Sequence, residues 1–372
     1  MTNKKTILIA TGIYPPDIGG PATYSKLLND ELPKRGFSVG VLNFGDFKKV
    51  PKIIRHFIYG WKVFRLAPNY QIIYVQDPVS VGLPVCLACW FRRKDFILKI
   101  VGDYAWEQGS QRFGVIDLLD EFSLSFKKYS WPVKILKKVQ TGVAKQAVKI
   151  IVPSKYLKKI VTNWGVAPEK IKVIYNSFDT PESLPGKEIL RSKLDWSGRI
   201  IVSVGRLVPW KGFNLLIDIM SELIAKYPET KLFIVGSGPD RAKLERQIKE
   251  RGLESSVSLT GGLTHQQVLE YLKASDLFVL NTSYEGFSHQ LLEALWCEVP
   301  IITTAVGGNV ELIENGKTGW LVNYNQREEL LGAIQEVFAS PEKTRGVINK
   351  GKEILNNFSK EKMLDNLIQE IS

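Results

Sequence analysis

Cysteine is scarce in this chain: Cys86, Cys89 and Cys297 are the only three among 372 residues. They are too few and too scattered for a disulfide framework. Cys86 and Cys89 form a lone CxxC inside the apolar run VGLPVCLACWF, with no second pair to complete a zinc site. We interpret both as reduced thiols in a protein core, and a reducing, cytoplasmic location is the consequence.

Long apolar runs are missing as well. The longest, Pro78 to Phe91, has about fourteen residues, whereas a membrane-spanning helix needs roughly twenty. The start, MTNKKTILIATGIYPP, carries two lysines and a short apolar stretch that Gly12, Pro15 and Pro16 interrupt. This pattern predicts a first strand and a turn, and neither a transmembrane span nor a signal peptide is expected.

Acidic residues are depleted in one half only. Residues 1–180 carry 28 Lys and Arg against 13 Asp and Glu, whereas residues 181–372 carry 22 against 25, and the net charge is +12. Such asymmetry indicates that the first half meets a polyanion: an anionic membrane, a nucleic acid or a phosphorylated substrate. Alternatively, these lysines lie on solvated faces and bind no polyanion.

The composition, the length and the pattern of strands and helices predict two α/β domains. Apolar residues make up 44% and charged residues 24%, an ordinary globular composition, and the length suits about two domains. Each half opens with an apolar strand, a glycine-bearing turn and an amphipathic helix, and short strands rich in Val and Ile follow. We expect two Rossmann-like parallel sheets, in residues 1–183 and 184–358, joined by a linker at 179–187. A helix over 359–372 should pack back on the first domain.

The stretch NTSYEGFSHQLLEALWCEVP, residues 281–300, is the most specific motif. Glu285 precedes a helix start at Gly286, Phe287 and Ser288, and Glu293 follows within the helix. The free amides of a helix N-terminus suit a phosphate, and flanking carboxylates can accept hydrogen bonds from sugar hydroxyls. Alternatively, Glu285 caps the helix and Glu293 is solvated.

This stretch and its continuation, PIITTAVGGNVELIENGKTGWLV, resemble the signature of retaining glycosyltransferases of family 4. GIYPPDIGGPATY resembles the first glycine loop of that family, and SVGRLVPWKGFNLLI and FIVGSGPDRAKL resemble two later loops. The resemblance covers nearly the whole chain. It implies a GT-B fold, with two domains facing across a cleft, and a hexosyltransferase that uses a UDP- or GDP-sugar with retention of configuration.

The resemblance also implies roles for individual residues. Arg206 and Lys211 should hold the diphosphate, Glu293 the ribose, and Glu285 should act at the transferred sugar. Gly19 and Gly20 would approach the sugar or its β-phosphate, because glycine lacks a Cβ that would clash. The remaining expected contacts of the donor sugar and diphosphate are Gly286, Phe287, Ser288, Gln290 and Leu291. Those of the nucleobase are Gly236, Gly238, Thr260 and Gly261.

Two features depart from common patterns of such enzymes. None of the fourteen aspartates lies two positions from another and the three histidines are isolated, so no metal and no cofactor are expected beyond the nucleotide sugar. Many relatives carry a histidine after a first-domain strand, where this chain has Gly102 and Asp103. Asp103 is predicted to replace it at the sugar, unless it merely caps the following turn.

The acceptor is less well defined. In this fold the first domain binds the acceptor, and two of its segments, Lys48 to Leu66 and Lys127 to Lys149, mix cations with large apolar side chains. They predict a glycan or lipid-linked acceptor and a peripheral place on an anionic membrane, unless their apolar residues face the core. The alternatives, a nucleic-acid-binding or an NAD-binding protein, are weaker, because no recognised nucleic-acid motif and no GxGxxG turn are present. The sequence does not identify the transferred sugar, the nucleobase of the donor or the linkage that is formed.

Overall fold

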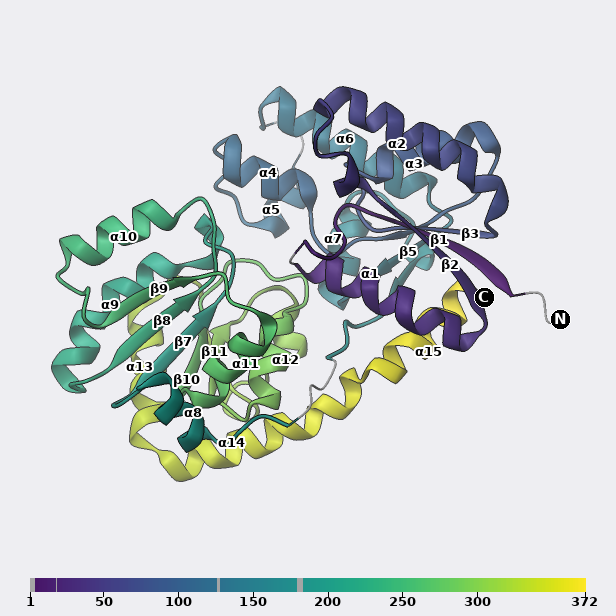
Figure 1. Cartoon of the computed structure of the whole chain (residues 1–372). Coiled ribbons are helices and arrows are strands. Elements are labelled where there is room, and N and C mark those ends of the chain that lie inside the picture. The colour runs from purple at the N-terminus through teal and green to yellow at the C-terminus, as the bar shows by residue number, and fades with distance from the viewer. Residues whose placement is uncertain (1–3, 18, 126–127, 179–182) are drawn as a thin grey trace. The chain divides into compact units, whose positions relative to one another are not determined.

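The computed structural model describes residues 4–17, 19–125, 128–178 and 183–372. The chain divides into two compact units (Figure 1). Unit 1 comprises residues 1–175 and 366–372, and unit 2 comprises residues 176–365. Residues 179–182 of the expected linker lie outside the described residues.

Unit 1 is built on a parallel six-stranded sheet in the order β2-β1-β3-β4-β5-β6. The strands are β1 (Lys5–Thr11), β2 (Phe37–Asn43), β3 (Ile72–Val75), β4 (Ile97–Lys99), β5 (Lys149–Val152) and β6 (Ile171–Val173). Ile7, Leu8 and Ile9 in β1 are fully buried, as expected for a parallel sheet covered on both faces.

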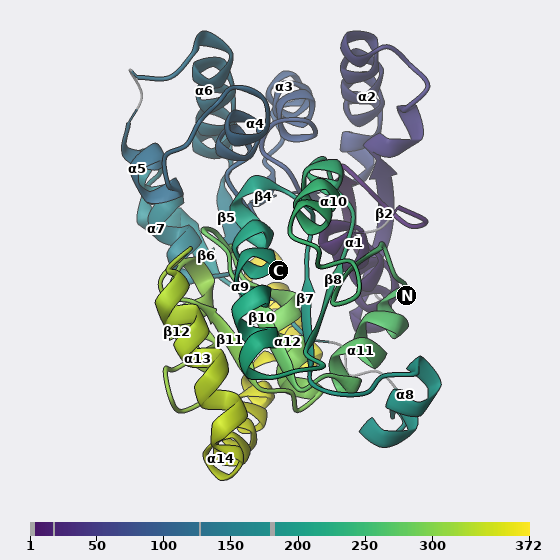
Figure 2. The ribbon, with the colours of Figure 1, turned by 90° about the vertical axis from the view of Figure 1, so that its left-hand side faces the viewer.

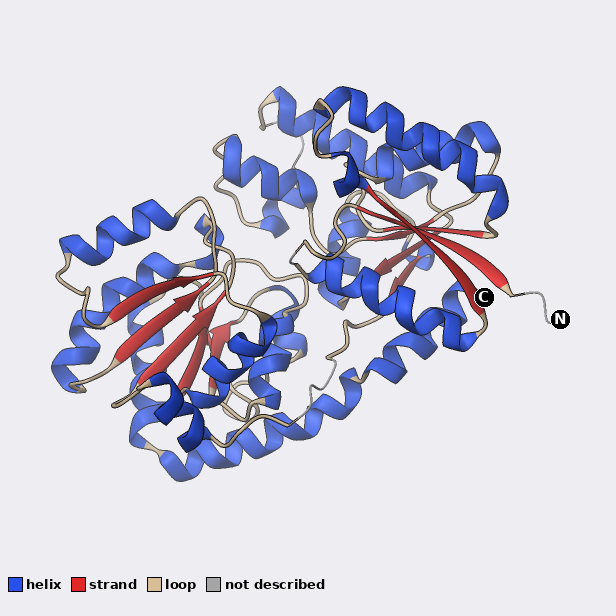
Figure 3. Cartoon of the chain, viewed as in Figure 1, coloured by secondary structure: helices blue, strands red, loops and turns tan. Residues whose placement is uncertain are grey.

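Helices cover both faces of this sheet (Figure 3). They are α1 (Gly20–Glu31), α2 (Lys52–Leu66), α3 (Gly82–Arg92), α4 (Tyr104–Arg112), α5 (Leu119–Leu124), α6 (Trp131–Gln146) and α7 (Lys155–Asn163). In Figures 1 and 2, α1 lies on one face, and α2, α3 and α6 lie on the other. This arrangement follows from right-handed crossovers, since the chain reverses direction across the sheet after β2.

Unit 2 repeats the architecture in the order β12-β11-β10-β7-β8-β9, again entirely parallel. Its strands are β7 (Ile200–Val204), β8 (Lys231–Val235), β9 (Val257–Gly261), β10 (Leu277–Leu280), β11 (Ile301–Thr304) and β12 (Trp320–Val322). Its helices are α8 (Lys187–Leu194), α9 (Phe213–Lys226), α10 (Arg241–Glu250), α11 (His265–Ala274), α12 (His289–Trp296), α13 (Arg327–Ala339) and α14 (Pro341–Glu353). The core forms where α9, α10 and α13 pack on the central strands.

A final helix, α15 (Lys360–Ile371), belongs to both units, because its residues from Asn366 onward are assigned to unit 1. There Lys149 on β5 forms an ion pair with Glu370 at 2.8 Å. Lys5 on β1 donates to the backbone oxygen of Ser372 at 2.7 Å. These contacts fix the last turn of the chain to the sheet of unit 1.

The structure confirms the two parallel α/β sheets that the sequence predicts. Cys86 and Cys89 are free, but only Cys89 is buried, whereas Cys86 is half-buried on α3. Among the described residues, no helix is both long and apolar enough to cross a bilayer.

Candidate functional site

The candidate site of unit 2 lies where the central strands β7 and β10 end. In parallel sheets the carboxyl ends of all strands share one edge, and ligands bind there. The loop after β7 contains Arg206 and Lys211, and the loop after β10 contains Glu285. Because β7 and β10 are hydrogen-bonded neighbours, residues that lie far apart in sequence meet at this edge.

The loop after β7 is held by backbone contacts that present its two cations. Gly212 adopts a left-handed conformation with φ 55°, and its carbonyl accepts a hydrogen bond from Asn281 Nδ2 at 3.1 Å. This close approach of two strand-end loops requires glycine, because a Cβ on Gly212 would lie 2.5 Å from the Asn281 carbonyl oxygen. Lys211 consequently reaches Glu285, and the two side chains form an ion pair. Arg206 is exposed on the same loop.

Glu285 and the start of α12 are fixed by a glycine pair. The amide of Gly308 donates to the Glu285 carbonyl at 2.9 Å. A Cβ on Gly307 would lie 2.2 Å from that carbonyl oxygen, and one on Gly308 would lie 2.5 Å from the Gly286 oxygen. The Ser288 hydroxyl accepts from the Leu291 amide at 3.4 Å and so caps the helix. The helix N-terminus and Glu285 therefore share one rigid corner of the site.

Glu293 lies on α12 and is 9% exposed. Its Oε1 atom is 3.0 Å from Nε2 of His265, the first residue of α11. His265, although isolated from the other histidines in the sequence, thus has a carboxylate partner in the fold. No sequence signal would have found this partner, because 28 residues separate the two and the pairing depends on how α11 and α12 pack.

The predicted nucleobase residues gather at the ends of β8 and β9. The Gly236 amide donates to the Gly261 carbonyl at 2.9 Å, and the Leu207 amide donates to the Ser237 carbonyl at 3.0 Å. Gly236 and Gly238 permit close approach of the β7 loop, since Cβ atoms there would lie 1.9 Å and 2.3 Å from backbone oxygens of residues 205 and 207. Thr260 lies beside them and donates to the Gly261 carbonyl at 3.0 Å.

In unit 1, Gly19 and Gly20 mark the start of α1. Gly19 has φ 149° and its carbonyl accepts from the amides of Ala22 and Thr23 at 3.0 Å and 3.1 Å. A Cβ on Gly20 would meet no atom within 4 Å. The turn therefore needs the conformational freedom of Gly19, whereas no crowding within the chain explains Gly20.

Asp103 is buried at the start of α4 in unit 1. Its Oδ1 atom accepts from the Trp106 amide and from Gln140 Nε2, both at 2.9 Å, and the residue is 0% exposed. Burial raises the pKa of the Asp103 carboxyl, and the hydrogen bond from Gln140 lowers it. The carboxylate is enclosed within unit 1, as expected if Asp103 caps the following turn, and its contact with the sugar stays a prediction. Asp103 is the N-cap of α4.

Within residues 4–17, 19–125, 128–178 and 183–372, no group of three or more His, Cys, Asp or Glu side chains is arranged to hold a metal ion. The charged groups of the site include those of Arg206, Lys211, Glu285 and Glu293.

Two family models cover most of the chain. Residues 18–182 match the model described as Glycosyltransferase Family 4, and residues 187–354 match Glycosyl transferases group 1. Two parallel α/β units of this kind form the GT-B fold, and both matching family models describe glycosyltransferases. The chain belongs to glycosyltransferase family 4.

Curated relatives agree with this assignment. The D-inositol 3-phosphate glycosyltransferase of Rhodococcus jostii is 29% identical over 221 residues, which are 57% of this chain and 49% of that protein. One component of the phosphatidylinositol N-acetylglucosaminyltransferase of Arabidopsis thaliana is 25% identical over 320 residues, 83% of this chain and 69% of that protein. The chain spans about half the length of several curated relatives it matches.

Solved structures share the fold. HepE of Anabaena in complex with UDP and glucose has a TM-score of 0.75 at 21% identity, covering 98% of this chain and 99% of that one. The sucrose-phosphate synthase of Thermosynechococcus elongatus has a TM-score of 0.78 at 19% identity, covering 98% of each chain.

Proposed function

We propose that this chain is a retaining hexosyltransferase that moves a sugar from a UDP- or GDP-sugar to a glycan or lipid-linked acceptor without a metal ion. The main observation that supports this proposal is that Lys211, Glu285 and the N-terminus of α12 meet at one corner of unit 2. Cations and free helix amides there suit a diphosphate, and a carboxylate beside them suits sugar hydroxyls. The structure of HepE with UDP and glucose supports a nucleotide-sugar donor.

Each side chain would have a distinct task in the reaction. The guanidinium of Arg206 would bind the diphosphate as a fork and the ammonium of Lys211 as a point charge. Both would stabilise the negative charge that develops on the leaving diphosphate in the transition state. Glu285 would orient the sugar, and Glu293 would bind the ribose hydroxyls. In the route we propose, the leaving phosphate takes the acceptor's proton on the same face, so no carboxylate nucleophile is required.

The acceptor proposal rests on charge and on relatives. Residues 1–180 carry the basic excess of the chain. The Arabidopsis relative is named for phosphatidylinositol, a membrane lipid. A lipid-linked acceptor in polysaccharide biosynthesis, used on the cytoplasmic side of a membrane, accounts for both.

Ligand-induced thermal stabilisation tests the donor class. UDP or GDP should raise the melting temperature of the full chain, because a ligand that binds only the folded state stabilises it. NAD and an RNA oligonucleotide should leave it unchanged. Stabilisation by NAD alone would overturn the proposal. Screening UDP- and GDP-sugars for donor hydrolysis would then identify the sugar and the base.

A further inference from the structure

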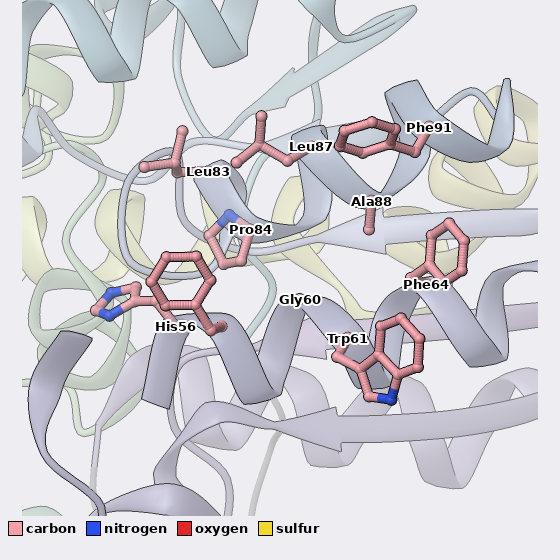
Figure 4. A pocket seen from close by; sticks show the side chains of 10 residues that line it. His56, Gly60, Trp61, Phe64, Leu83, Pro84, Leu87, Ala88 and Phe91 are labelled. Atoms are coloured by element: carbon pink, nitrogen blue, oxygen red, sulfur yellow. The ribbon is translucent and has the colours of Figure 1, made fainter. Parts of the chain in front are cut away.

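An apolar groove runs between α2 and α3 of unit 1 (Figure 4). Its volume is about 650 Å³, and its walls include Phe57, Trp61 and Phe64 from α2 and Leu83, Leu87 and Phe91 from α3. Figure 4 shows Gly60 and Ala88 between these two rows of side chains. The two helices pack against each other there, and a Cβ on Gly60 would make ordinary contact with Pro84 at 3.4 Å, so this spacing does not itself require glycine.

The side chains of this groove are unusually exposed for their type. Phe57 is 75% exposed, Trp61 60% and Phe91 67%. Trp90, which packs edge-on against Phe91 at 4.7 Å, is 69% exposed. Single exposed apolar residues are common, but a contiguous set of large ones marks an interaction surface. We call these residues, with Leu83, Leu87 and Phe64, the α2–α3 surface.

Cations outnumber carboxylates in the segment that forms the α2–α3 surface. Residues 48–95 contain nine Lys and Arg but two acidic residues, Asp77 and Asp95, and Asp95 lies beside Arg93, Lys94 and Phe91. Asp77 is engaged locally, since its Oδ1 accepts from the amides of Val79 and Val81 at 2.7 Å and 3.2 Å. Arg92 links the two helices: its guanidinium lies 3.7 Å from the centre of the Phe64 ring, and its Nε donates to the Phe64 carbonyl at 2.9 Å. Lys62, Arg65 and Arg93 are exposed.

We propose that the α2–α3 surface docks unit 1 onto a bilayer that contains anionic phospholipid. Trp and Phe side chains partition into the interface of a bilayer, and neighbouring Lys and Arg meet anionic headgroups while their stems remain in apolar contact. Membrane docking deepens the proposed function, and it rests on that function only in that the acceptor is held at a membrane. The docking itself requires neither donor nor acceptor.

Charge argues against a second copy of the chain as the occupant. A two-fold interface brings the same patch of both partners together, so the cations of one copy would face those of the other. A nucleic acid would match the cations, but the groove wall is formed mainly by aliphatic and aromatic carbon, with few groups that could hydrogen-bond to bases.

The structure also locates the docking surface more narrowly than the sequence does. Of the two basic segments singled out there, Lys127 to Lys149 includes α6, and Lys127 lies outside the described residues. On α6, Lys137 is 5% exposed and donates to the carbonyls of Phe122 and Ser125, so it supports the fold. Lys128 is paired with Asp117 at 2.9 Å. The α2–α3 surface takes its α2 residues from the first basic segment and adds residues of α3, whose apolar sequence is typical of core.

Co-sedimentation with vesicles tests the proposal on the full chain. Vesicles of phosphatidylcholine with about one third phosphatidylglycerol should bind the protein, and those of phosphatidylcholine alone should bind it much less. Raising the salt concentration should release it, because screening weakens surface attraction. The double variant Trp61→Ser, Phe91→Ser should lower the vesicle partition coefficient about tenfold or more. Both side chains are exposed, so folding should be retained.

Matched controls lie on α6. Trp131→Ser removes an aromatic side chain that is 72% exposed at the start of that helix and should leave binding unchanged. Likewise, Lys62→Glu with Arg93→Glu should abolish binding, whereas Lys138→Glu with Lys145→Glu, an equal change in charge, should not. Stabilisation by UDP should be equal in all variants, so that loss of docking is distinguishable from failure of the donor site.

Three outcomes would overturn the proposal. Equal losses in the α2–α3 and α6 variants would mean that net charge alone causes binding. Competition by an RNA oligonucleotide that depends on Trp61 and Phe91 would assign the surface to nucleic acid. A dimer in solution that the double variant converts to monomers would assign it to a second copy of the chain.

Discussion

The ammonium group of Lys211 contacts the carboxylate of Glu285, although 74 residues separate them along the chain. The contact joins the loops that follow β7 and β10, the two neighbouring strands of unit 2. A group proposed to hold phosphate therefore lies directly beside a group proposed to face the sugar. A donor diphosphate would compete with Glu285 for the same ammonium.

Glu285→Gln should separate donor affinity from turnover. Because the amide no longer competes for Lys211, the affinity for UDP or GDP should be retained or should rise severalfold. Turnover should fall about tenfold or more, since a charged group that acts in the transition state is lost. Calorimetric titration and an initial-rate assay measure the two quantities. A variant with wild-type turnover would remove Glu285 from the reaction.

Glu293→Gln should mainly weaken donor binding. A ribose contact is made equally in the ground state and in the transition state, so KM for the nucleotide sugar should rise with kcat little changed. His265→Ala removes the partner of Glu293 Oε1 without touching the carboxylate and should have a smaller effect. Unchanged donor affinity in Glu293→Gln would place the ribose elsewhere.

Gly308→Ala should distort the corner that holds Glu285. The added Cβ would lie 2.5 Å from the Gly286 carbonyl, so the backbone must move at a cost of roughly 1–3 kcal/mol. We expect a lower melting temperature and a loss of nucleotide binding. Gly332→Ala is the control, because a Cβ there meets nothing within 4 Å on a helix and should be neutral or stabilising.

Lys99 should make the stability of unit 1 depend on pH. Burial lowers the pKa of Lys99, on β4, to about 7. Between pH 7 and about 9 the unfolded chain retains this proton while the folded chain releases it, so stability rises with pH by up to about 1.4 kcal/mol per unit. Below pH 7 both forms are protonated and the full penalty of the buried ammonium applies.

Urea unfolding at about pH 6.5, 8 and 9 measures this slope across the titration of Lys99. Lys99→Met should flatten it. A residual slope of the same sign is expected from Lys137, because burial lowers the pKa of its ammonium to about 8. An unchanged slope in Lys99→Met would show that Lys99 does not titrate in this pH range.

Sugar transfer should persist in EDTA. Arg206, Lys211 and the amides at the start of α12 would provide the positive charge that a divalent cation supplies in other transferases. Initial rates with and without chelator check this. Complete loss that manganese or magnesium restores would contradict the proposed metal-free chemistry.

Much of the fold could be predicted from sequence because short buried strands alternate with amphipathic segments, as in β7 and α9. The sequence did not show which residues of the apolar run Pro78 to Phe91 are buried and which are exposed. Consecutive apolar residues on α3 have no periodicity that separates a core face from an exposed face. The motif indicated Glu285 and Glu293 as site residues. Their partners Lys211 and His265, and the burial of Asp103, depend on packing between distant segments.

The last turn of α15 has a consequence for how the protein is made. Residues 366–372 complete unit 1, yet the ribosome adds them only after all of unit 2. Until then Lys149 lacks Glu370, and the side of unit 1 that Leu367 and Ile371 cover in the finished protein is bare. Domains usually fold in the order of their synthesis. Here unit 2 can fold first, and unit 1, although made earlier, can be completed only once residues 366–372 have been synthesised.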